Sequence, residues 1–375
     1  MKRIIQFIRK EIVFSIALIL AVASMVVVPP SKKYIDYIDY KVIVLLFCLM
    51  AVVAGMQKLG VFSWLGKKLT SCVSKRRYLN LILVLLCFFS SMLITNDVAL
   101  ITFVPFTIVV YAAIEDEGSL ITLIVLETIA ANVGSVLTPI GNPQNLFLFS
   151  LSKMDVGDFV MLMLPLAAVS LIVLVIMTLM TGNNAGESNV KPAEEEKGNS
   201  FLNVRFFVYA VLFVVCLLNV FHVIPYYVVL LLVLIGIVLM DYKLLLKVDY
   251  ILLLTFICFF IFVGNMKEIE SVSSFLKSIV DGKEVLTGVV ASQVISNVPA
   301  AMLLSGFTDK YEALLYGTNI GGMGTLIASM ASLISYKFYS QRKTAKKGKY
   351  MLIFTVYNII LLVILLGVAK WRNVL

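Results

Sequence analysis

The chain has 375 residues, of which 61% are apolar and only 14% are charged. Soluble domains carry about 25% charged residues, so this sequence has too few polar residues to cover a water-facing surface. The net charge of +9 comes from basic residues in short segments between apolar runs, where membrane topology explains them and no nucleic-acid partner is needed. The composition therefore predicts an all-α integral membrane protein with many crossings.

The N-terminal segment combines four basic residues, an apolar run and the small residues at 21–23. A cleavable signal peptide has the same three parts. Because the apolar run continues to Val28, we interpret 12–29 as the first membrane span instead. We expect about nine crossings, at 12–29, 42–57, 119–152, 158–181, 203–221, 225–240, 250–265, 310–338 and 350–370.

Two further apolar segments, 78–112 and 284–307, each carry a polar motif in their middle. The first motif is LITNDVA, which begins at Leu93, and the second is VISNVPA, which begins at Val294. Both place a hydroxyl-bearing residue directly before an asparagine. Because each motif interrupts an apolar run at its centre, we interpret both segments as re-entrant hairpins, which enter and leave on one side of the membrane.

A second motif is also repeated. ANVGSVLT, which begins at Ala131, matches TNIGGMGT, which begins at Thr318, with Asn, Gly and Thr in register. The clustered glycine and proline residues around these motifs predict that the spans at 119–152 and 310–338 are interrupted helices. Unwound backbone in a bilayer is tolerated only where it is buried in protein or lines a cavity, so we expect the two breaks to surround a site.

The two motifs occur in the same order on either side of a polar, Gly- and Glu-rich segment that is typical of a flexible linker. With four crossings in each repeat and one between them, the second repeat is upside down relative to the first, as in many secondary transporters. The predicted organisation is a first repeat at 1–181 with a hairpin at 78–112, a cytoplasmic linker at 182–202, a connecting span at 203–221, and a second, inverted repeat at 222–375 with a hairpin at 284–307.

The positions of lysine and arginine predict the orientation, because cytoplasmic loops carry an excess of these residues. Most of the 31 Lys and Arg residues lie on the same side as the N-terminus. We therefore expect a plasma-membrane protein, in bacteria of the inner membrane, with a cytoplasmic N-terminus and linker and an external C-terminus. The first hairpin then opens from the cytoplasm and the second from the exterior.

The helix starts beside the breaks are candidate anion sites. Asn142 followed by Pro143 has the form of an N-cap with proline at the first helical position, and Asn297 near Pro299 has a similar form. Such starts direct free N–H groups and the positive end of the helix dipole toward an anion. The alternative is that the polar residues only hold helices together. Sodium prefers oxygen ligands, and the candidate sodium ligands are Thr95, Asn96, Asn132, Ser296, Asn297 and Asn319.

Asp97 and Glu127 are carboxylates within apolar sequence, where an acidic residue is costly and by default functional. Asp97 follows the asparagine of the first hairpin, and Glu127 lies five residues before Asn132. We expect both to approach the same cavity and to carry a proton or hold a cation. The alternative for Asp97 is that it only caps its helix. Val298 occupies the matching position of the second repeat, which predicts asymmetric coupling.

At TNDVALITFVPF, ANVGSVLTPIGNPQNLF, SNVPAAML and TNIGGMGT the chain resembles the ion transporter superfamily. This group includes citrate-transporter-like permeases, divalent-anion/sodium symporters, arsenite permeases and certain sodium/proton antiporters. The resemblance implies that hairpins and unwound helices hold substrate and coupling ions, and that transport is an elevator-like movement against a scaffold that often forms a homodimer. It gives hairpin-tip roles to Thr95, Asn96, Ser296 and Asn297. It gives unwound-helix roles to Asn132, Gly134, Thr138, Asn319, Gly321 and Thr325.

One departure from the carboxylate symporters is that Thr95-Asn96-Asp97 replaces their Ser-Asn-Thr, which is closer to the arsenite-permease and antiporter branch. The sequence thus predicts a secondary active transporter of a small anion, either a carboxylate or an inorganic oxyanion, coupled to sodium or protons. The alternatives are an arsenite efflux permease or a sodium/proton antiporter, and, in another class, an ion channel.

An enzyme is not expected, because HExxH and GxSxG motifs are absent and the chain has one histidine. No cofactor is expected beyond the coupling sodium ion or proton. The expected partners are the anion, the lipid bilayer and a second copy of the chain. The predicted substrate- and ion-binding residues are Thr95, Asn96, Asp97, Asn132, Gly134, Thr138, Asn142, Ser296, Asn297, Thr318, Asn319, Gly321 and Thr325.

Overall fold

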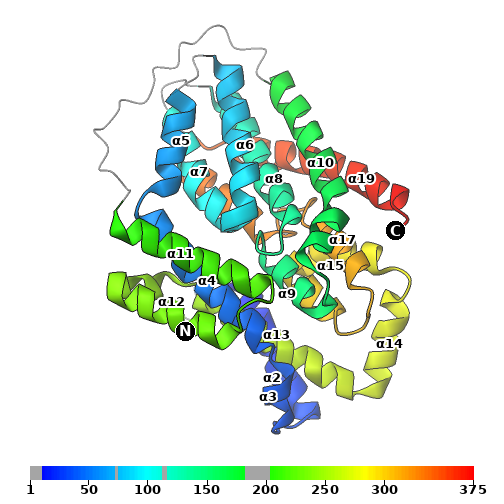
Figure 1. Ribbon diagram of the computed structural model, residues 1–375. Coiled ribbons are helices and arrows are strands. Elements are labelled where there is room, and N and C mark those ends of the chain that lie inside the picture. The colour runs from blue at the N-terminus through cyan, green and yellow to red at the C-terminus, as the bar shows by residue number, and fades with distance from the viewer. Residues whose placement is uncertain (1–10, 72–74, 112–115, 182–202) are drawn as a thin grey trace.

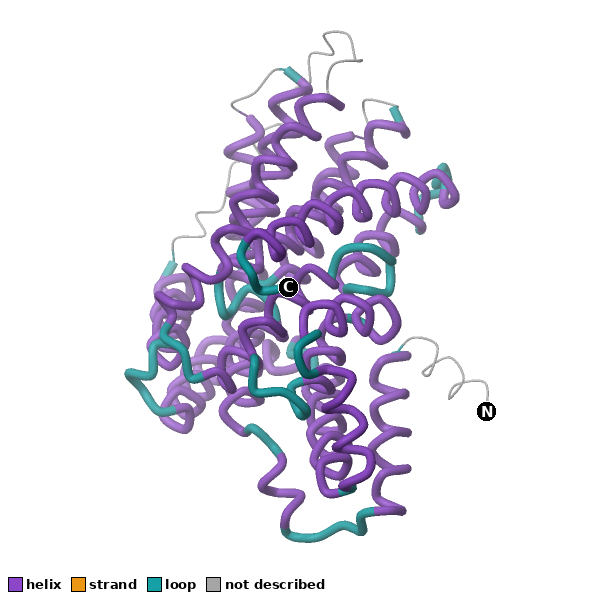
Figure 2. Tube along the Cα trace, turned by 90° about the vertical axis from the view of Figure 1, so that its right-hand side faces the viewer, coloured by secondary structure: helices purple, strands orange, loops and turns teal. Residues whose placement is uncertain are grey.

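The computed structural model describes residues 11–71, 75–111, 116–181 and 203–375 (Figure 1). Within these ranges the chain forms helices joined by loops and turns, without a strand (Figure 2). The all-α prediction is therefore confirmed, whereas the predicted linker at 182–202 lies outside the described residues. The helices are α2 (Ile12–Val27), α3 (Lys33–Tyr37), α4 (Tyr40–Lys58), α5 (Val61–Ser71), α6 (Arg76–Ile94), α7 (Asn96–Tyr111), α8 (Glu117–Gly134), α9 (Pro143–Ser152), α10 (Val156–Thr181), α11 (Val204–Val220), α12 (Tyr226–Asp241), α13 (Tyr250–Glu268), α14 (Glu270–Val280), α15 (Glu284–Ile295), α16 (Asn297–Leu304), α17 (Tyr311–Gly321), α18 (Met330–Ser340) and α19 (Lys347–Trp371), with short 3₁₀ helices η1 (Ser135–Leu137) and η3 (Tyr242–Lys247).

Seven helices in the described ranges are long and apolar enough to cross a membrane. Six of them coincide with predicted crossings, and the seventh, α6, is the first arm of the predicted hairpin at 78–112. The other three predicted crossings consist of shorter helices. α2 has 16 residues, α11 has 17, and the span at 310–338 is divided into α17 and α18 of 11 residues each. A crossing needs about 17 to 25 residues, so the total of nine stays a prediction.

Large apolar side chains cover the outer faces of the peripheral helices. Val26 of α2, Ile172 of α10, Val211 of α11, Leu239 of α12 and Leu352 of α19 are between 60% and 82% exposed. Soluble monomers rarely expose apolar patches that extend over several elements. These faces therefore contact lipid, and the burial that stabilises the fold is found between the helices.

The helices group into two bundles (Figure 1). The small bundle consists of α2, α3, α4, α11, α12 and α13, in which α4 packs between α11 and α12, and α2 packs along α13. The large bundle consists of α6 to α10 and α15 to α19. Two short helices connect the bundles: α5 follows α4 and leads into α6, and α14 follows α13 and leads into α15. The small bundle thus contains helices from both halves of the chain.

The start of α8 is fixed to the base of the α6–α7 pair by Asp116. This side chain caps α8 by accepting a hydrogen bond from the Ser119 backbone N–H at 3.1 Å, and it pairs with Arg76 at 2.9 Å. The Arg76 side chain is only 6% exposed, so Asp116 is its charge partner in a largely dry position. Burial on its own raises the pKa of Asp116, but the hydrogen bonds from Ser119 and Arg76 lower that pKa to about 2.

We expect Asp116→Ala to destabilise the protein. The lost N-cap costs about 1 kcal/mol, and leaving Arg76 buried without a carboxylate adds to that cost. A carboxylate with a lowered pKa stabilises the fold above its ordinary pKa of about 4, and this stabilisation disappears as the pH falls toward 2. Thermal unfolding in detergent should therefore separate the variant from the wild type at pH 7 and much less at pH 2.5. An equal difference in unfolding temperature between the variant and the wild type at both pH values contradicts the stabilising role of the ionised Asp116.

Candidate functional site

Two helix pairs turn sharply at a hydroxyl-bearing residue with a positive φ angle. Thr95 joins α6 to α7 with φ 72° and ψ 151°, and Ser296 joins α15 to α16 with φ 73° and ψ 155°. Residues other than glycine rarely adopt this region, and doing so costs about 1–3 kcal/mol. The same strained conformation therefore occurs at both motifs where the sequence predicts a break. The surrounding contacts must hold each turn in place.

Each turn is held by a carbonyl group from an unwound segment. The Asn96 N–H donates to the Gly141 carbonyl at 3.1 Å, and the Asn297 N–H donates to the Ala328 carbonyl at 2.9 Å. Gly141 lies between α8 and α9, and Ala328 lies between α17 and α18. Both predicted interruptions are therefore present, and each one binds the tip of the helix pair from its own half of the chain.

The two halves also share threonine contacts. Thr138 Oγ1 donates to the Met92 carbonyl at 2.5 Å, and Thr325 Oγ1 donates to the Gln293 carbonyl at 3.2 Å. Thr138 and Thr325 are the matched threonines of the repeated motif, and each one bonds to the helix just before the strained turn. These predicted site residues therefore fix the backbone of the turns. Thr318 bonds to the Leu314 carbonyl of its own helix.

Asn132 of α8 is the centre of a buried polar network. Its Oδ1 accepts hydrogen bonds from Asn96 Nδ2 and from Ser329 Oγ, each at 3.1 Å, and its Nδ2 donates to Ser332 Oγ at 3.2 Å. Asn132 therefore joins the tip of the first helix pair to the start of α18. Because Ala328, which holds the second tip, is the neighbour of Ser329, both predicted tips meet in one cluster.

Asn319 of α17 makes the reciprocal contacts. Its Nδ2 donates to Asn145 Oδ1 at 2.6 Å, and its Oδ1 accepts from Asn142 Nδ2 at 3.3 Å. Thus the asparagine of each broken helix bonds to the first turn, or the cap, of the other broken helix. The side chains of Asn132 and Asn319 are 5% and 4% exposed, so this exchange takes place inside the protein.

The start of α9 has the predicted cap, but the start of α16 does not. Asn142 Oδ1 accepts from the Asn145 N–H at 2.8 Å, and Pro143 is the first helical residue. In the second half, the prediction that Asn297 is an N-cap is wrong, because Ser296 occupies the cap position. Asn297 Oδ1 instead accepts from the adjacent Val298 N–H at 3.0 Å. The strained φ of Ser296 moves the break one residue toward the N-terminus.

Two predicted site glycines allow close helix contacts. A Cβ atom on Gly134 would lie 2.1 Å from the Phe88 carbonyl oxygen, and one on Gly321 would lie 2.6 Å from Ser292 Oγ. Phe88 belongs to α6 and Ser292 to α15. Each glycine therefore lets the broken helix of its half approach the first arm of the helix pair.

The two candidate carboxylates are not in one cavity. Asp97 is half-buried in the first turn of α7, and no hydrogen bond or ion pair of its carboxylate involves a described residue. Glu127 is fully buried, and its Oε1 accepts from Thr107, while Oε2 has no hydrogen-bond partner among the described residues. Thr107 follows Asp97 by ten residues, which is about 15 Å along α7. The prediction that Glu127 approaches the same site as Asp97 is therefore corrected.

The oxygen atoms proposed as sodium ligands differ in their availability. The amide oxygens of Asn132 and Asn319 accept hydrogen bonds, as described above, so they position other groups. Better candidates for sodium ligands are the hydroxyl oxygens of Thr95 and Ser296 and the carbonyl oxygens of the unwound segments. The described residues contain no cluster of three or more His, Cys, Asp or Glu side chains suited to a metal ion.

Sequence reasoning missed the side chains that complete the network. Asn145 and Ser332 follow Asn142 and Ser329 by three residues, and each pair lies on one face at a helix start. The repeat register that matches Asn132 with Asn319 also matches Asn142 with Ser329 and Asn145 with Ser332. This match was the sequence signal that could have identified Asn145 and Ser332 as site residues. Gln293 was also missed: its Nε2 donates to the Gly321 and Met323 carbonyls at 2.8 and 2.9 Å.

A cavity of about 510 Å³ lies between the two bundles, next to α9, α13 and α16. Phe147 of α9 lines it and packs against Phe256 and Phe260 of α13, with ring centroids 6.2 and 5.6 Å apart. Met302 of α16 and Ser305 also line this cavity.

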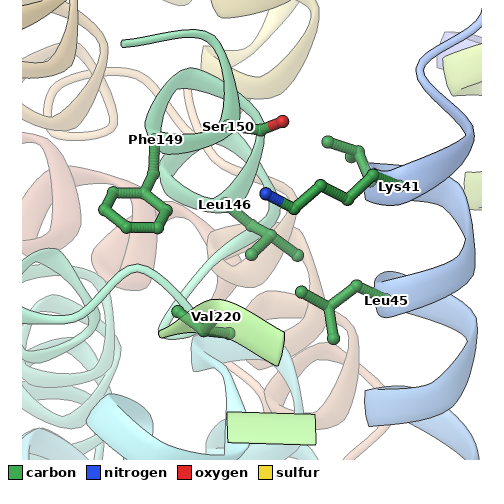
Figure 3. Close-up of a pocket in the computed structure, with 7 residues that line it drawn as sticks. Lys41, Leu45, Leu146, Phe149, Ser150 and Val220 are labelled. Carbon is green, nitrogen blue, oxygen red and sulfur yellow. The ribbon is translucent and has the colours of Figure 1, made fainter. Parts of the chain in front are cut away.

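A different face of α9 contacts α4 and the turn after α11. Lys41 points into a small pocket beside α9, toward Ser150 (Figure 3). Lys41 Nζ lies 2.9 Å from His222 Nε2, and Ser150 Oγ donates to Asp39 Oδ2 at 3.0 Å. Lys41 and His222 both belong to the small bundle, so the hydrogen bond from Ser150 to Asp39 is the polar contact of this group that movement of the large bundle along the small one would break.

Apolar outer helices around a buried polar network of broken helices and strained helix pairs are the architecture of a multi-pass membrane transporter. The family model described as citrate transporter matches residues 3–309 of this chain. The chain belongs to this citrate transporter family.

Similar proteins agree with this membership, two of them of similar length to this chain. The uncharacterized transporter MJ0456 of Methanocaldococcus jannaschii is 32% identical over 340 residues, which cover 89% of this chain and 90% of MJ0456. The inner membrane protein YbiR of Escherichia coli is 30% identical over 344 residues, which cover 88% of each chain. The silicon efflux transporter LSI3 of Oryza sativa is 34% identical over 128 residues, which cover 34% of this chain and 26% of LSI3. The family and these names point to a transporter and not to an enzyme.

Proposed function

We propose that the protein is a secondary active transporter of a small anion, a carboxylate or an inorganic oxyanion, coupled to sodium or protons. The observation that carries this proposal is the reciprocal exchange of asparagine contacts between the two broken helices. It brings two helix starts and two strained tips to one buried place, where helix N-termini favour an anion. The citrate transporter family membership supports an anionic substrate.

The matched contacts also support two inverted repeats with re-entrant hairpins. Gly141 bonds to Asn96 as Ala328 bonds to Asn297, and the two strained turns share one conformation. Such equivalence is expected when one structural unit occurs twice. The predicted crossing count and the excess of basic residues on the N-terminal side support an opposite orientation of the units and a cytoplasmic N-terminus.

The division into two bundles supports an elevator-type movement. The polar network lies within the large bundle, whereas the small bundle has lipid-facing outer helices and fits a stationary scaffold that dimerises. The contacts between the bundles include the hydrogen bond from Ser150 to Asp39 and the ring contact of Phe147 with Phe256. Helices α5 and α14 are short connections that permit the large bundle to move relative to the small one.

The proposal predicts that Asn96→Ala and Asn297→Ala abolish uptake. Each variant removes a side chain at a strained tip, and Asn96→Ala also removes a hydrogen bond to Asn132. Uptake of radiolabelled citrate, succinate, phosphate and arsenite into proteoliposomes, with a sodium or a pH gradient, is the measurement. We expect at least a tenfold loss of the initial rate for the anion that the wild type transports.

Asn203→Ala is the matched control, because Asn203 is exposed and caps α11 far from the network. It should transport at the wild-type rate. Transport by both tip variants at that rate argues against the proposed site. Single-channel conductance steps in planar bilayers identify an ion channel instead.

A second candidate function is an efflux permease for arsenite or a sodium/proton antiporter. Asp97 beside Asn96 favours it, and so does the likeness of one third of the chain to a silicon efflux transporter. Everted vesicles distinguish the two functions, because an efflux permease accumulates arsenite in them when a proton gradient is applied. A sodium/proton antiporter collapses that gradient when sodium alone is added.

A further inference from the structure

Gln144 is a buried side chain without a hydrogen-bond partner among the described residues. It is the second residue of α9 and is 2% exposed. Its backbone N–H likewise makes no hydrogen bond within the described chain. The side-chain amide atoms keep a small accessible surface, whereas the rest of the residue is buried. Because no group of the described chain bonds to these atoms, the partner of this amide is water or a ligand.

Its neighbours cannot serve as partners because their groups are already committed. Asn142 caps α9 and donates to Ser135 Oγ at 3.1 Å and to Asn319. Asn145 Nδ2 donates to three carbonyl groups of the unwound segment, and its Oδ1 accepts from Asn319. Gln144 is thus the one amide of the NPQN sequence that is left to bind a ligand, since Pro143 has no N–H group.

The position of Gln144 on α9 places it toward the second helix pair and the small bundle. Residues three and seven positions further, Phe147 and Leu151, lie on the same helical face and line the 510 Å³ cavity together with Met302 of α16. Gln144 is one turn deeper than Phe147, on the side of the polar network. It therefore lies between the network residues Asn142 and Asn145 at the start of α9 and the cavity that Phe147 lines one turn further on.

We propose that Gln144 binds the transported anion, donating from its side-chain amide and its backbone N–H to an oxygen of a carboxylate or inorganic oxyanion. This assignment rests on the proposed function and adds a residue to its site. The start of α9 contributes its dipole to the same oxygen. A neutral amide holds the anion without a permanent positive charge, which permits release on the other side of the membrane.

Gln144→Glu tests the assignment with almost no change of shape. The carboxylate removes the side-chain donors and repels an anion, so KM for the transported anion should rise at least tenfold. Gln144→Asn, which keeps the amide on a shorter side chain, should give an intermediate KM. Gln341→Glu is the matched control, because Gln341 is exposed at the end of α18, and its KM should equal that of the wild type. Thermal unfolding reports whether each variant is folded.

A second measurement does not depend on transport by the variant. Gln144→Cys, combined with Cys72→Ser, is labelled with a membrane-permeant maleimide in the presence or absence of the anion that the wild type transports. Because the anion must reach position 144 during transport, the maleimide should reach it as well, and the same chain without Gln144→Cys reports the background from the buried native cysteines, Cys48, Cys87, Cys216 and Cys258. Bound anion should slow labelling at position 144 at least threefold.

The outcomes separate this assignment from the proposed function. If the wild type transports none of citrate, succinate, phosphate or arsenite, the proposed function and this assignment are both overturned. If the wild type transports one of them, while Gln144→Glu keeps KM within twofold and the anion does not slow labelling, only the role of Gln144 is overturned. A tenfold higher KM with slowed labelling supports it.

Discussion

Gly134→Ala is expected to be among the most damaging single substitutions in this protein. The added Cβ would lie 2.1 Å from the Phe88 carbonyl oxygen and 2.6 Å from Ser91 Oγ. A backbone carbonyl cannot rotate away as a side chain can, so α6 and α8 must move apart. Overpacking of a core costs about 1–3 kcal/mol, and here the displacement also pulls Asn132 away from Asn96. We expect a lower unfolding temperature and no transport.

The measurement is thermal unfolding in detergent, followed by uptake in proteoliposomes. Gly321→Ala, at the matching position, should be less damaging, because the nearest obstacle is the side chain of Ser292. Gly157→Ala in α10 is the control, since a Cβ there has no neighbour within 4 Å. Equal unfolding temperatures for all three variants contradict the close approach of α6 and α8.

The breaks in the helices were predictable because they depend on local chemistry. A threonine or serine before an asparagine, in the middle of an apolar run, marks both strained turns. The Asn142-Pro143 cap also followed from local rules, since the cap and the first helical residue are adjacent in sequence. The same rule failed at Asn297. Pro299 is the third residue of α16, so the helix can begin at Asn297 with Ser296 as its cap, one residue earlier than we expected.

The partners of the asparagines were not predictable in the same way. Ser329 and Ser332 bond to Asn132 across almost 200 positions of sequence, and only the packing of α18 against α8 brings them together. The separation of Asp97 from Glu127 also depends on packing. Both residues lie within five positions of a motif asparagine in sequence, yet α7 carries Thr107, the partner of Glu127, away from the tip.

The proposed ion-coupled transport requires a coupling group, and the two candidates are Asp97 and Glu127. A coupling group must exchange its proton or cation with water in at least one state. Glu127 is 0% exposed and accepts a hydrogen bond from Thr107, so it is sealed between helices. Asp97 is half-buried at the tip, adjacent to Asn96. It also lies close enough to Asp249, the cap of α13 in the small bundle, for the two charges to interact.

In the proposed elevator movement, this arrangement would link the charge of Asp97 to the position of the large bundle. While Asp97 is ionised, Asp249 repels it, and a bound proton or cation removes the repulsion. Binding of a proton or cation to Asp97 therefore changes the free energy of bringing the tip next to α13. Binding to Glu127, which is sealed between helices, does not change that free energy. Coupling requires a difference of this kind between the two positions of the moving part.

We expect Asp97→Asn to abolish the pH or sodium dependence of transport while substrate exchange continues, because asparagine is uncharged in both positions of the bundle. The measurement is proteoliposome uptake at pH 5.5, 7 and 8.5, with and without sodium, alongside counterflow of the labelled substrate. Glu127→Gln is the matched variant and should keep the wild-type dependence. If Glu127→Gln loses the pH or sodium dependence of transport while Asp97→Asn keeps it, then Glu127 is the coupling group. In that case the repulsion between Asp97 and Asp249 does not drive the movement.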